Sequence, residues 1–356
     1  MTQRELTVDT FDALVAAERG LEARLRTRIL PAIARYAAVE VPPLPRHRAG
    51  VGALTTLLRS EAATWVARML AGRVANEPGF PEVDAGPLLA STAPQELAKL
   101  RCFLAYFDRV ADAPPHGSIE IERIVGGAHD WLHDASALQP FEIHATGAIE
   151  DAAGCLQVDF ANSYLGGGVL SGGCVQEEIR FALAPELLAA MIVSPVMEPS
   201  EAIVVRGTER FAATTGYGFT LRYAGPFTDP STSDLVAIDA LDYRQSRVAR
   251  GEAALRRELD KARAGFRRDA RNQAVATGNW GCGVFRGDPV AKAIVQWLAA
   301  STEGRAVRYF TFGDDRLGDL EAFVTRVRGF SVGELARRLF ANASWRGISL
   351  YGMILA

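Results

Sequence analysis

Clustered cysteines and histidines are missing from this 356-residue chain. Its four cysteines lie far apart, without the short paired spacing of a zinc or redox site; they are Cys102, Cys155, Cys174 and Cys282. We therefore expect reduced, buried thiols. The five histidines are confined to residues 47–144. Neither residue type predicts a metal site.

Long apolar runs are missing as well, and none is long enough to span a bilayer. The N-terminal residues lack the basic segment followed by an apolar one that marks a secretory signal. A cytoplasmic protein without a membrane partner is therefore expected. Lys and Arg number 39 against 42 Asp and Glu, which gives a net charge of -3. This balance excludes a general affinity for nucleic acid, so any basic surface has to be local.

Several common catalytic motifs are absent too. The chain contains no G-x-x-x-x-G-K-[ST], no G-x-G-x-x-G after a strand, no H-E-x-x-H and no G-x-S-x-G. These absences argue against a P-loop nucleoside triphosphatase and against a dinucleotide-binding domain of the Rossmann type. Metal-dependent hydrolysis and serine hydrolysis are disfavoured for the same reason.

The order of patterns along the chain predicts the fold class. Residues 11–33, 54–70 and 92–112 show helical apolar spacing, so three helices are expected before any strand. Strands are predicted later in the chain, at 119–125, 141–150, 156–160, 202–205, 235–239, 273–277 and 307–312. Continuously apolar strands are covered on both faces. We therefore predict an α/β fold, with a helical accessory region at 1–115 and a domain with a central sheet between helical layers at 116–356.

Three capping patterns mark expected helix starts. They are Thr92-x-x-Gln95, Asp288 before Pro289, and Ser331-x-x-Glu334. Each pattern supplies a side chain that can accept a hydrogen bond from a backbone N–H of the first turn.

Two glycine-rich segments follow predicted strands. The first contains Gly166, Gly167 and Gly168, and the second runs from 277 to 288; a helical pattern follows each one. Each is either a flexible connection or a loop whose N–H groups bind an anion beside a helix N-terminus. Two such loops in one sheet domain favour a shared ligand that carries phosphates.

Adjacent acids, Glu177 and Glu178, open the helical pattern after the first glycine segment. They are either favourable charges in a first turn or catalytic carboxylates. Because neighbouring helical residues diverge by about 100°, two catalytic acids here would have different roles. One would orient substrate hydroxyls and the other would act as general acid or base. Asp159 and Asn162, at the preceding strand end, are either turn residues or part of the same site.

Aromatic and basic residues allow two interpretations each. Phe285 is either a pocket ring or a loop anchor, and Phe312 belongs to the core or stacks on a flat base. The segment from Arg244 to Arg271 contains ten Lys or Arg against four Asp or Glu. It is either a solvated helix with i,i+4 pairs or a surface for an anionic polymer.

Residues 158–181, VDFANSYLGGGVLSGGCVQEEIRF, resemble the signature of poly(ADP-ribose) glycohydrolases, a GGG loop followed by Q-E-E. Further similar stretches follow in the family's order: FLAYFDRV (103–110), RGTERFAATTGYG (206–218), LVAIDAL (235–241), RRELDKARAGF (256–266), VATGNWGCGVFRGD (275–288) and YFTFGD (309–314). The resemblance covers roughly residues 90–320. The sequence departs from it at Ser163, where a basic residue is usual, and at Arg286, where glycine is common.

The resemblance implies a macrodomain that hydrolyses the ribose–ribose O-glycosidic bonds of poly(ADP-ribose) and releases ADP-ribose. In this interpretation Glu178 is the general acid/base and Glu177 orients the ribose hydroxyls. Asp159 and Asn162 would support that site. No metal and no cofactor is implied. The partners would be poly(ADP-ribose) or ADP-ribosylated proteins, and the setting would be the DNA damage response.

Substrate contacts are implied by the same resemblance. The two glycine segments would cradle the diphosphate, Tyr217 and Phe285 would shape the pocket above it, and Phe312 would stack near adenine. The implied substrate-binding residues are Asn162, Gly166, Gly167, Gly168, Gln176, Tyr217, Gly281, Gly283, Val284, Phe285, Phe312, Ile149 and Glu150. The last two resemble the family's adenine-contacting pair.

An alternative function is a reader module that binds ADP-ribose without cleaving it. The intact Q-E-E favours the hydrolase, since a pure binder has no use for an acid at Glu178. A third possibility is a hydrolase that removes single ADP-ribose units from protein side chains.

Overall fold

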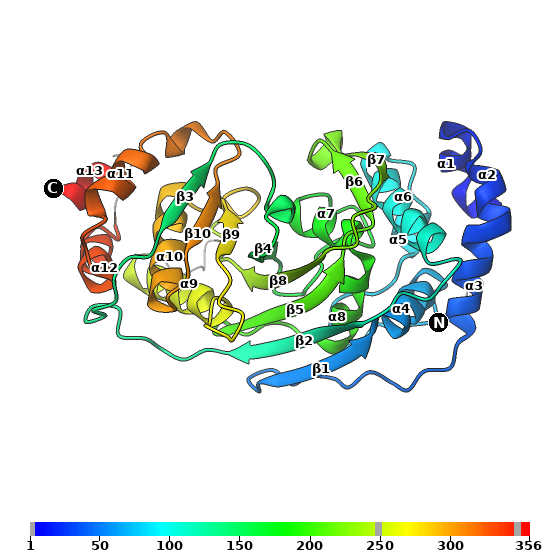
Figure 1. The fold of residues 1–356 in the computed structure, drawn as a ribbon, viewed down its shortest axis with the longest axis horizontal. Helices are drawn as coiled ribbons and strands as arrows, with labels where there is room; N and C mark the ends of the chain where they lie inside the picture. The colour runs from blue at the N-terminus through cyan, green and yellow to red at the C-terminus, as the bar shows by residue number, and fades with distance from the viewer. Residues whose placement is uncertain (1–3, 246–250, 345–349) are drawn as a thin grey trace. The chain divides into compact units, whose positions relative to one another are not determined.

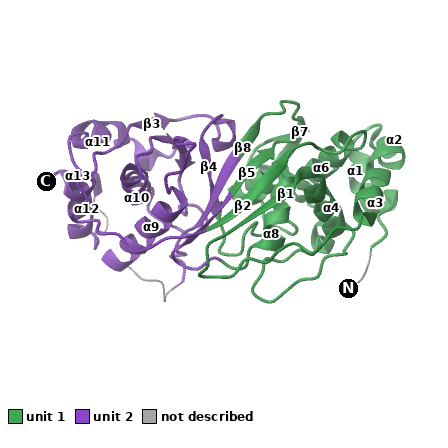
Figure 2. Cartoon of the chain, turned by 60° about the horizontal axis from the view of Figure 1, so that its bottom comes forward, with its two compact units in different colours: residues 1–123, 161–196, 205–233 green, residues 124–160, 197–204, 234–356 purple. Residues whose placement is uncertain are grey.

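The computed structural model describes residues 4–245, 251–344 and 350–356. The chain divides into two compact units, each assembled from separate stretches of sequence (Figure 2). Unit 1 contains residues 1–123, 161–196 and 205–233; unit 2 contains 124–160, 197–204 and 234–356. The linear division at residue 115 stays a prediction, because these units reflect packing rather than domain boundaries.

The strands form an eight-stranded mixed sheet and a separate two-stranded sheet (Figure 1). The order in the large sheet is β1-β2-β5-β8-β4-β9-β10-β3, and β6 pairs with β7 in the small one. The bounds are Ala53–Leu58 (β1), Ser118–Val125 (β2), Phe141–His144 (β3), Leu156–Ala161 (β4), Glu201–Glu209 (β5), Ala212–Thr215 (β6), Arg222–Pro226 (β7), Thr232–Asp239 (β8), Val275–Gly278 (β9) and Val307–Phe310 (β10). Each strand predicted from residue 118 onward coincides at least in part with a strand of the large sheet. The predicted α/β fold is confirmed.

Helices dominate unit 1. Their bounds are Asp12–Ala17 (α1), Leu21–Arg24 (α2), Leu30–Ala38 (α3), Arg59–Leu70 (α4), Gly86–Leu89 (α5), Pro94–Arg109 (α6), Gln176–Leu183 (α7) and Leu188–Val193 (α8), with shorter turns Val8–Phe11 (η1), Leu25–Ile29 (η2) and Pro185–Leu187 (η4). Leu21, Leu25, Ile29 and Ile33 recur every four residues and are at most 2% exposed. This apolar stripe explains why the segment folds as stacked helical turns. Within unit 1, α3 packs on α4, while α1 and η2 contact α6.

The helix predicted across residues 54–70 is wrong in its first third. Residues Ala53–Leu58 form strand β1, which pairs antiparallel with β2 from Ala53 opposite Arg123 to Leu58 opposite Ser118. Only from Arg59 onward does the helix α4 begin. The segment ALTTLL alternates buried and exposed residues, so pairing with a distant strand overrides helical propensity. A strand therefore precedes the third predicted helix.

The start of α6 also differs from its prediction. This helix begins at Pro94 with Ala93 as its N-cap, so the capping box predicted at Thr92 is wrong. Proline suits a first helical turn because its missing N–H would have had no intrahelical acceptor. The backbone N–H of Ala93 donates instead to Ser91 Oγ at 3.1 Å.

Unit 2 contains the parallel strands and the C-terminal helices. Strand β10 pairs in parallel with β3 and β9, and β9 with β4. Every residue of β9 is buried, as expected for a strand covered on both faces. The helices are Glu252–Gly265 (α9), Pro289–Thr302 (α10), Leu320–Val327 (α11), Val332–Ala341 (α12) and Leu350–Leu355 (α13), and α9 packs on α10.

The other two predicted helix starts are confirmed in unit 2. Asp288 accepts the Ala291 N–H at 2.9 Å and so caps α10. Ser331 accepts the Glu334 N–H at 3.2 Å, and the Ser331 N–H donates to the Glu334 carboxylate at 2.6 Å. This reciprocal pair is the capping box expected for α12.

The basic segment from residue 244 to 271 forms ion pairs inside unit 2. Arg256 pairs with Glu252 one turn earlier at 2.6 Å, and Arg271 pairs with Asp234 at 2.5 Å. The basic residues at positions 247 and 250 lie outside the described part. These pairs support the interpretation as a helix with intrahelical and local ion pairs. In the described ranges, no helix combines the length and apolar character that a membrane crossing requires.

His47 is a buried titratable group in unit 1. It is 6% exposed, and its ring Nε2 lies 2.9 Å from Thr55 Oγ1. Its backbone N–H donates to the Val193 carbonyl at 2.9 Å. Burial lowers the pKa of His47 to about 4, and the charge of Arg123 acts in the same direction. The folded state therefore favours neutral histidine.

We expect the free energy of unfolding to fall as the pH drops from about 6.5 to about 4. Neutral His47 contributes fully above its unfolded-state pKa, and the contribution of up to about 3 kcal/mol disappears as the pH falls through the folded-state value. Urea unfolding across this range measures the loss. His47→Gln should flatten the profile, whereas His133→Gln, at a side chain 80% exposed, should not. Equal slopes for wild type and His47→Gln would contradict this assignment.

Candidate active site

The first glycine loop, residues 162–175, connects β4 to α7. Glu177 and Glu178 lie in the first turn of α7 and are 3% and 6% exposed. Burial of two adjacent carboxylates requires strong compensating partners. The loop and the two acids all belong to unit 1.

Four backbone N–H groups hold the two carboxylates. Glu177 accepts hydrogen bonds from the N–H of Asn162 at 2.9 Å and of Gly166 at 2.6 Å. Glu178 accepts from Gly168 at 3.0 Å through Oε1 and from Val175 at 2.9 Å through Oε2. Hydrogen bonds to an ionised acceptor are the stronger kind. The neighbouring acids are therefore fixed by different parts of the loop, in line with the separate roles predicted for them.

The three consecutive glycines do not offer free N–H groups to a ligand. Gly166 and Gly168 donate to the carboxylates, and Gly167 donates to the Tyr164 carbonyl at 3.2 Å. The predicted diphosphate cradle at these three N–H groups is therefore corrected: the anions they bind are the protein's own glutamates. Both acids lie in the first turn of α7, directly after the loop and in the same unit.

Glycine is required here by close approach. A Cβ at Gly167, whose φ is +50°, would lie 2.5 Å from Glu178 Oε1 and 2.7 Å from Glu177 Oε2. A Cβ at Gly173 would also lie 2.5 Å from Glu178 Oε1. The absence of a Cβ at these positions lets the backbone approach the carboxylate pair.

The polar residues around β4 differ in exposure. Asn162 is exposed, and its side-chain oxygen accepts the Tyr164 N–H at 3.0 Å, so it forms a turn as well as donating to Glu177. The interpretation of Asn162 as a turn residue is confirmed, and its role in the site stays a prediction. Asp159 lies on β4 and is fully buried, and Gln176 is half-buried at the start of α7. A supporting role for Asp159 stays a prediction.

Tyr217 lies on a turn fixed to the first glycine loop. The N–H of Gly218 donates to the Cys174 carbonyl at 3.0 Å, and the N–H of Tyr217 donates to Thr220 Oγ1 at 3.0 Å. The turn Gly218–Thr220 (η5) is part of unit 1. The Tyr217 side chain is 56% exposed, so it is available to a ligand.

The second glycine loop, residues 279–288 in unit 2, has a rigid base. Trp280 is fully buried, and its indole N–H donates to the Ile238 carbonyl at 2.9 Å. The Gln296 side-chain amide donates to the Gly278 carbonyl at 3.0 Å, and the Gly287 backbone N–H donates to the Gly281 carbonyl at 2.8 Å. These contacts fix both ends of the loop between β9 and α10.

The tip of this loop is open. Gly283 and Val284 are exposed, and Phe285 is half-buried, with the Arg244 guanidinium 5.6 Å from its ring centre. Within the described ranges, the N–H groups of Gly283, Val284 and Phe285 have no protein acceptor. Consecutive free N–H groups of this kind can bind an anion. Anion binding by the second loop stays a prediction, which its N–H groups without a protein acceptor support.

Two features of the second loop were not predicted. Arg286 has φ +58°, a conformation that favours glycine. Lys292 on α10 is 3% exposed, pairs with Glu258, and places its ammonium 3.8 Å from the Trp280 ring centre. Burial lowers the pKa of Lys292 well below its ordinary value. No local sequence pattern distinguishes this lysine from a solvent-exposed one.

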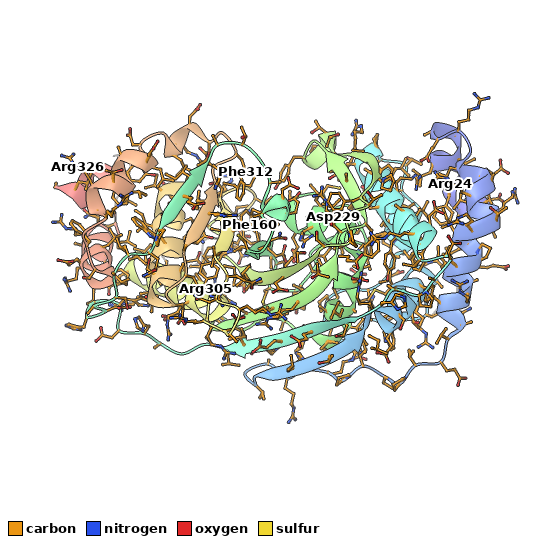
Figure 3. The ribbon with its side chains drawn as sticks, in the orientation of Figure 1. Arg24, Phe160, Asp229, Arg305, Phe312 and Arg326 are labelled. Carbon is orange, nitrogen blue, oxygen red and sulfur yellow. The ribbon has the colours of Figure 1, made fainter. Side chains whose placement is uncertain are left out.

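An aromatic group lies past the end of β10 in unit 2. Phe312, labelled in Figure 3, has φ +52° and is 49% exposed. Its ring covers Gly278, where an added Cβ would lie 2.7 Å from the ring edge. Phe310 stacks on His144 with ring centres 5.0 Å apart and lies 6.3 Å from the Phe312 ring. Phe312 thus has an open face, and its interpretation as a stacking ring is favoured over a core role.

The predicted adenine pair is mostly covered. Ile149, on the turn Ile149–Asp151 (η3), is 2% exposed and packs in a cluster with Phe310 and Ala276. Glu150 is half-buried. Of this pair, Glu150 is therefore the more accessible residue, and a contact of either residue with adenine stays a prediction. In the portion of the chain with described coordinates, no three His, Cys, Asp or Glu side chains are grouped as metal ligands.

Residues 128–319 match the family model described as "Poly (ADP-ribose) glycohydrolase (PARG), Macro domain fold". The chain belongs to the poly(ADP-ribose) glycohydrolase family. The resemblance recognised in the sequence is confirmed, and the matched range contains every predicted site residue, from Ile149 to Phe312.

Curated relatives carry the family's name. Poly(ADP-ribose) glycohydrolase 1 of Arabidopsis thaliana is 34% identical over 349 residues, covering 72% of this chain and 64% of that protein. Poly(ADP-ribose) glycohydrolase 1 of Caenorhabditis elegans is 32% identical over 341 residues, covering 88% of this chain and 42% of that protein. The chain thus spans less than two thirds of each relative's length.

Solved glycohydrolase structures show weaker similarity. A poly(ADP-ribose) glycohydrolase of Deinococcus radiodurans in complex with ADP-ribose is 20% identical, with a TM-score of 0.33. The match covers 55% of this chain and 86% of that one. This similarity adds nothing to the family assignment.

The contact between Gly173 and Glu178 predicts different effects of alanine at neighbouring glycines. Gly173→Ala should lower the free energy of unfolding by about 1 to 3 kcal/mol, because its Cβ collides with a carboxylate that is held on both oxygens. Gly172→Ala, whose Cβ meets only Glu96 Oε1 at 3.7 Å, should change it by less than about 0.5 kcal/mol. Urea unfolding of both variants gives the comparison. Equal losses would show that the carboxylate is not held as described.

Proposed function

We propose that this protein hydrolyses the ribose–ribose O-glycosidic bonds of poly(ADP-ribose) and releases ADP-ribose. The observation that carries the proposal is the buried pair Glu177 and Glu178, held by four backbone N–H groups, in a chain of the glycohydrolase family. A glycosidase needs a carboxyl group fixed beside the scissile bond. The structure supports this requirement at Glu178.

Glu178 would donate its proton to the leaving ribose oxygen as the anomeric C–O bond breaks. The positive, oxocarbenium-like centre would then be attacked by water, and Glu178 would take a proton from that water. The proton given in the first step is thus recovered in the second. Each carboxylate oxygen accepts only one of the protein N–H bonds described above, so a lone pair on either oxygen can still carry the transferred proton.

Glu177 would orient the substrate. Its two oxygens accept the N–H groups of Asn162 and Gly166, which fix the carboxylate in a defined orientation. Fixed acceptors of this kind align the sugar before the reaction and lower its entropic barrier. The two acids would therefore divide orientation and proton transfer between them.

Unit 2 contains groups that suit an ADP-like ligand. Among the described residues, the N–H groups of Gly283, Val284 and Phe285 have no protein acceptor and fit a diphosphate, and the open face of Phe312 fits a flat base. On unit 1, the exposed Tyr217 side chain would contact a ligand bound at the first glycine loop. ADP-ribosylated proteins as partners, a cytoplasmic location and a role in the DNA damage response also remain proposals.

Glu178→Gln tests the proposed acid/base. Wild type should release ADP-ribose from poly(ADP-ribose), and the variant should do so about 100-fold to 10,000-fold more slowly, because glutamine cannot donate the proton. Affinity for ADP-ribose, measured by calorimetry, should be retained. Binding without release by wild type would favour the alternative, an ADP-ribose reader. Release from mono-modified protein would indicate the hydrolase of single units.

Phe312→Ala tests the base contact. Losing one aromatic face should weaken ADP-ribose binding about tenfold, since stacking contributes about 1 to 1.5 kcal/mol. Phe312→Tyr keeps the ring and should bind as wild type does. The folded state should be little affected, because half of the side chain is already exposed. An unchanged dissociation constant for Phe312→Ala would remove Phe312 from the site.

A further inference from the structure

Lys99 on α6 is fully buried in unit 1, and it lies outside the range matched by the family model. Its ammonium group donates to four backbone carbonyls of the first glycine loop. These are Gly168 at 3.3 Å, Val169 at 3.0 Å, Ser171 at 2.7 Å, and Gly173. An ammonium has three donors, so the four oxygens surround it and share them.

Such an arrangement is costly unless every donor is satisfied. Burial lowers the pKa of Lys99, while the Cys174 thiol and the Glu178 carboxylate act in the opposite direction. Four loop carbonyls accept hydrogen bonds from the Lys99 ammonium group. Peptide dipoles of one loop therefore contribute to compensating the buried charge.

Residues of the loop that bind Lys99 through their carbonyls also contact Glu178. The Gly168 carbonyl binds Lys99, while the Gly168 N–H donates to Glu178 Oε1 at 3.0 Å. The Gly173 carbonyl also binds Lys99, and the α-carbon of Gly173 lies where an added Cβ would touch the Glu178 carboxylate. The Gly173 N–H donates to the Gly168 carbonyl at 3.1 Å and closes the loop. Lys99 and Glu178 thus both contact the segment 168–173, through different groups of its backbone.

We propose that Lys99 is a positioning residue for Glu178. By binding the carbonyls of residues 168–173, it fixes the curvature that presents the Gly168 N–H to the carboxylate and brings Gly173 against it. The consequence for catalysis rests on the proposed glycohydrolase function, whereas the structural part does not. The N-terminal helical region thereby acquires a role, since α6 packs on α7 and carries Lys99.

The chain provides a matched control in Lys261. It is also fully buried, and its ammonium donates to the carbonyls of Glu198 at 2.8 Å and Glu201 at 2.6 Å and pairs with Asp239 at 2.5 Å. None of these partners belongs to the first glycine loop. Lys261→Met therefore removes a buried charge from backbone carbonyls without changing the contacts between Lys99 and the first glycine loop.

The experiment compares wild type, Lys99→Met and Lys261→Met in the full chain. For Lys99→Met we expect kcat on poly(ADP-ribose) to fall about 100-fold, as for a catalytic group misplaced by about 1 Å, with KM little changed. Amide hydrogen exchange should rise within residues 162–175. Lys261→Met should lose stability but keep kcat and the protection of that loop.

Hydrogen exchange separates this inference from the proposed function, because it needs no turnover. If wild type is inactive on the polymer but Lys99→Met alone loses protection in residues 162–175, the proposed function fails and the positioning role stands. If kcat and loop protection are unchanged in Lys99→Met, the positioning role is overturned. Should Lys99→Met not fold, Lys99→Gln, which keeps two N–H donors, makes the same comparison. An intermediate kcat with partial loop protection is expected for it, and wild-type values would overturn the proposal.

Discussion

The constraint on which the site depends is the need to partner two adjacent buried carboxylates. Four backbone N–H groups of the first glycine loop meet that need for Glu177 and Glu178. Backbone can come this close only where no Cβ intervenes, as at Gly167 and Gly173. The path of the loop, the start of α7 and the different surroundings of the two acids all follow from this arrangement.

Each glycine loop lies against a buried lysine. Lys99 binds the carbonyl side of the first loop, and Lys292 lies beneath Gly281 and Gly287 in the second. In the first loop, the N–H groups of Gly166 and Gly168 bind the glutamate pair. In the second, the N–H groups of Gly283, Val284 and Phe285 have no protein acceptor among the described residues and can bind an anionic ligand.

Much of the fold could be predicted from sequence because its signals are local. Apolar strands such as β9 and the caps at Asp288 and Ser331 can each be recognised from a few consecutive residues. Strand β1 did not, because its partner β2 lies some sixty residues further along and only that pairing selects strand over helix. The acids and glycines of the site were also visible, but the direction of the N–H groups was not. Nor could the burial of Lys99 be predicted, since no local sequence pattern distinguishes a buried lysine on a helix from an exposed one.

Glu178 has a second task that bears on how related sequences are read. Through Oε2 it accepts the N–H of Val175 and so closes the first turn of its own helix. A contact of this kind, one half of a capping box, stabilises the start of a helix. A related protein without catalytic activity would therefore still gain folding stability from this glutamate. The expectation that a pure binder has no use for an acid at Glu178 is therefore too strong. Only measured turnover distinguishes an enzyme from an ADP-ribose reader that retains the same Q-E-E motif.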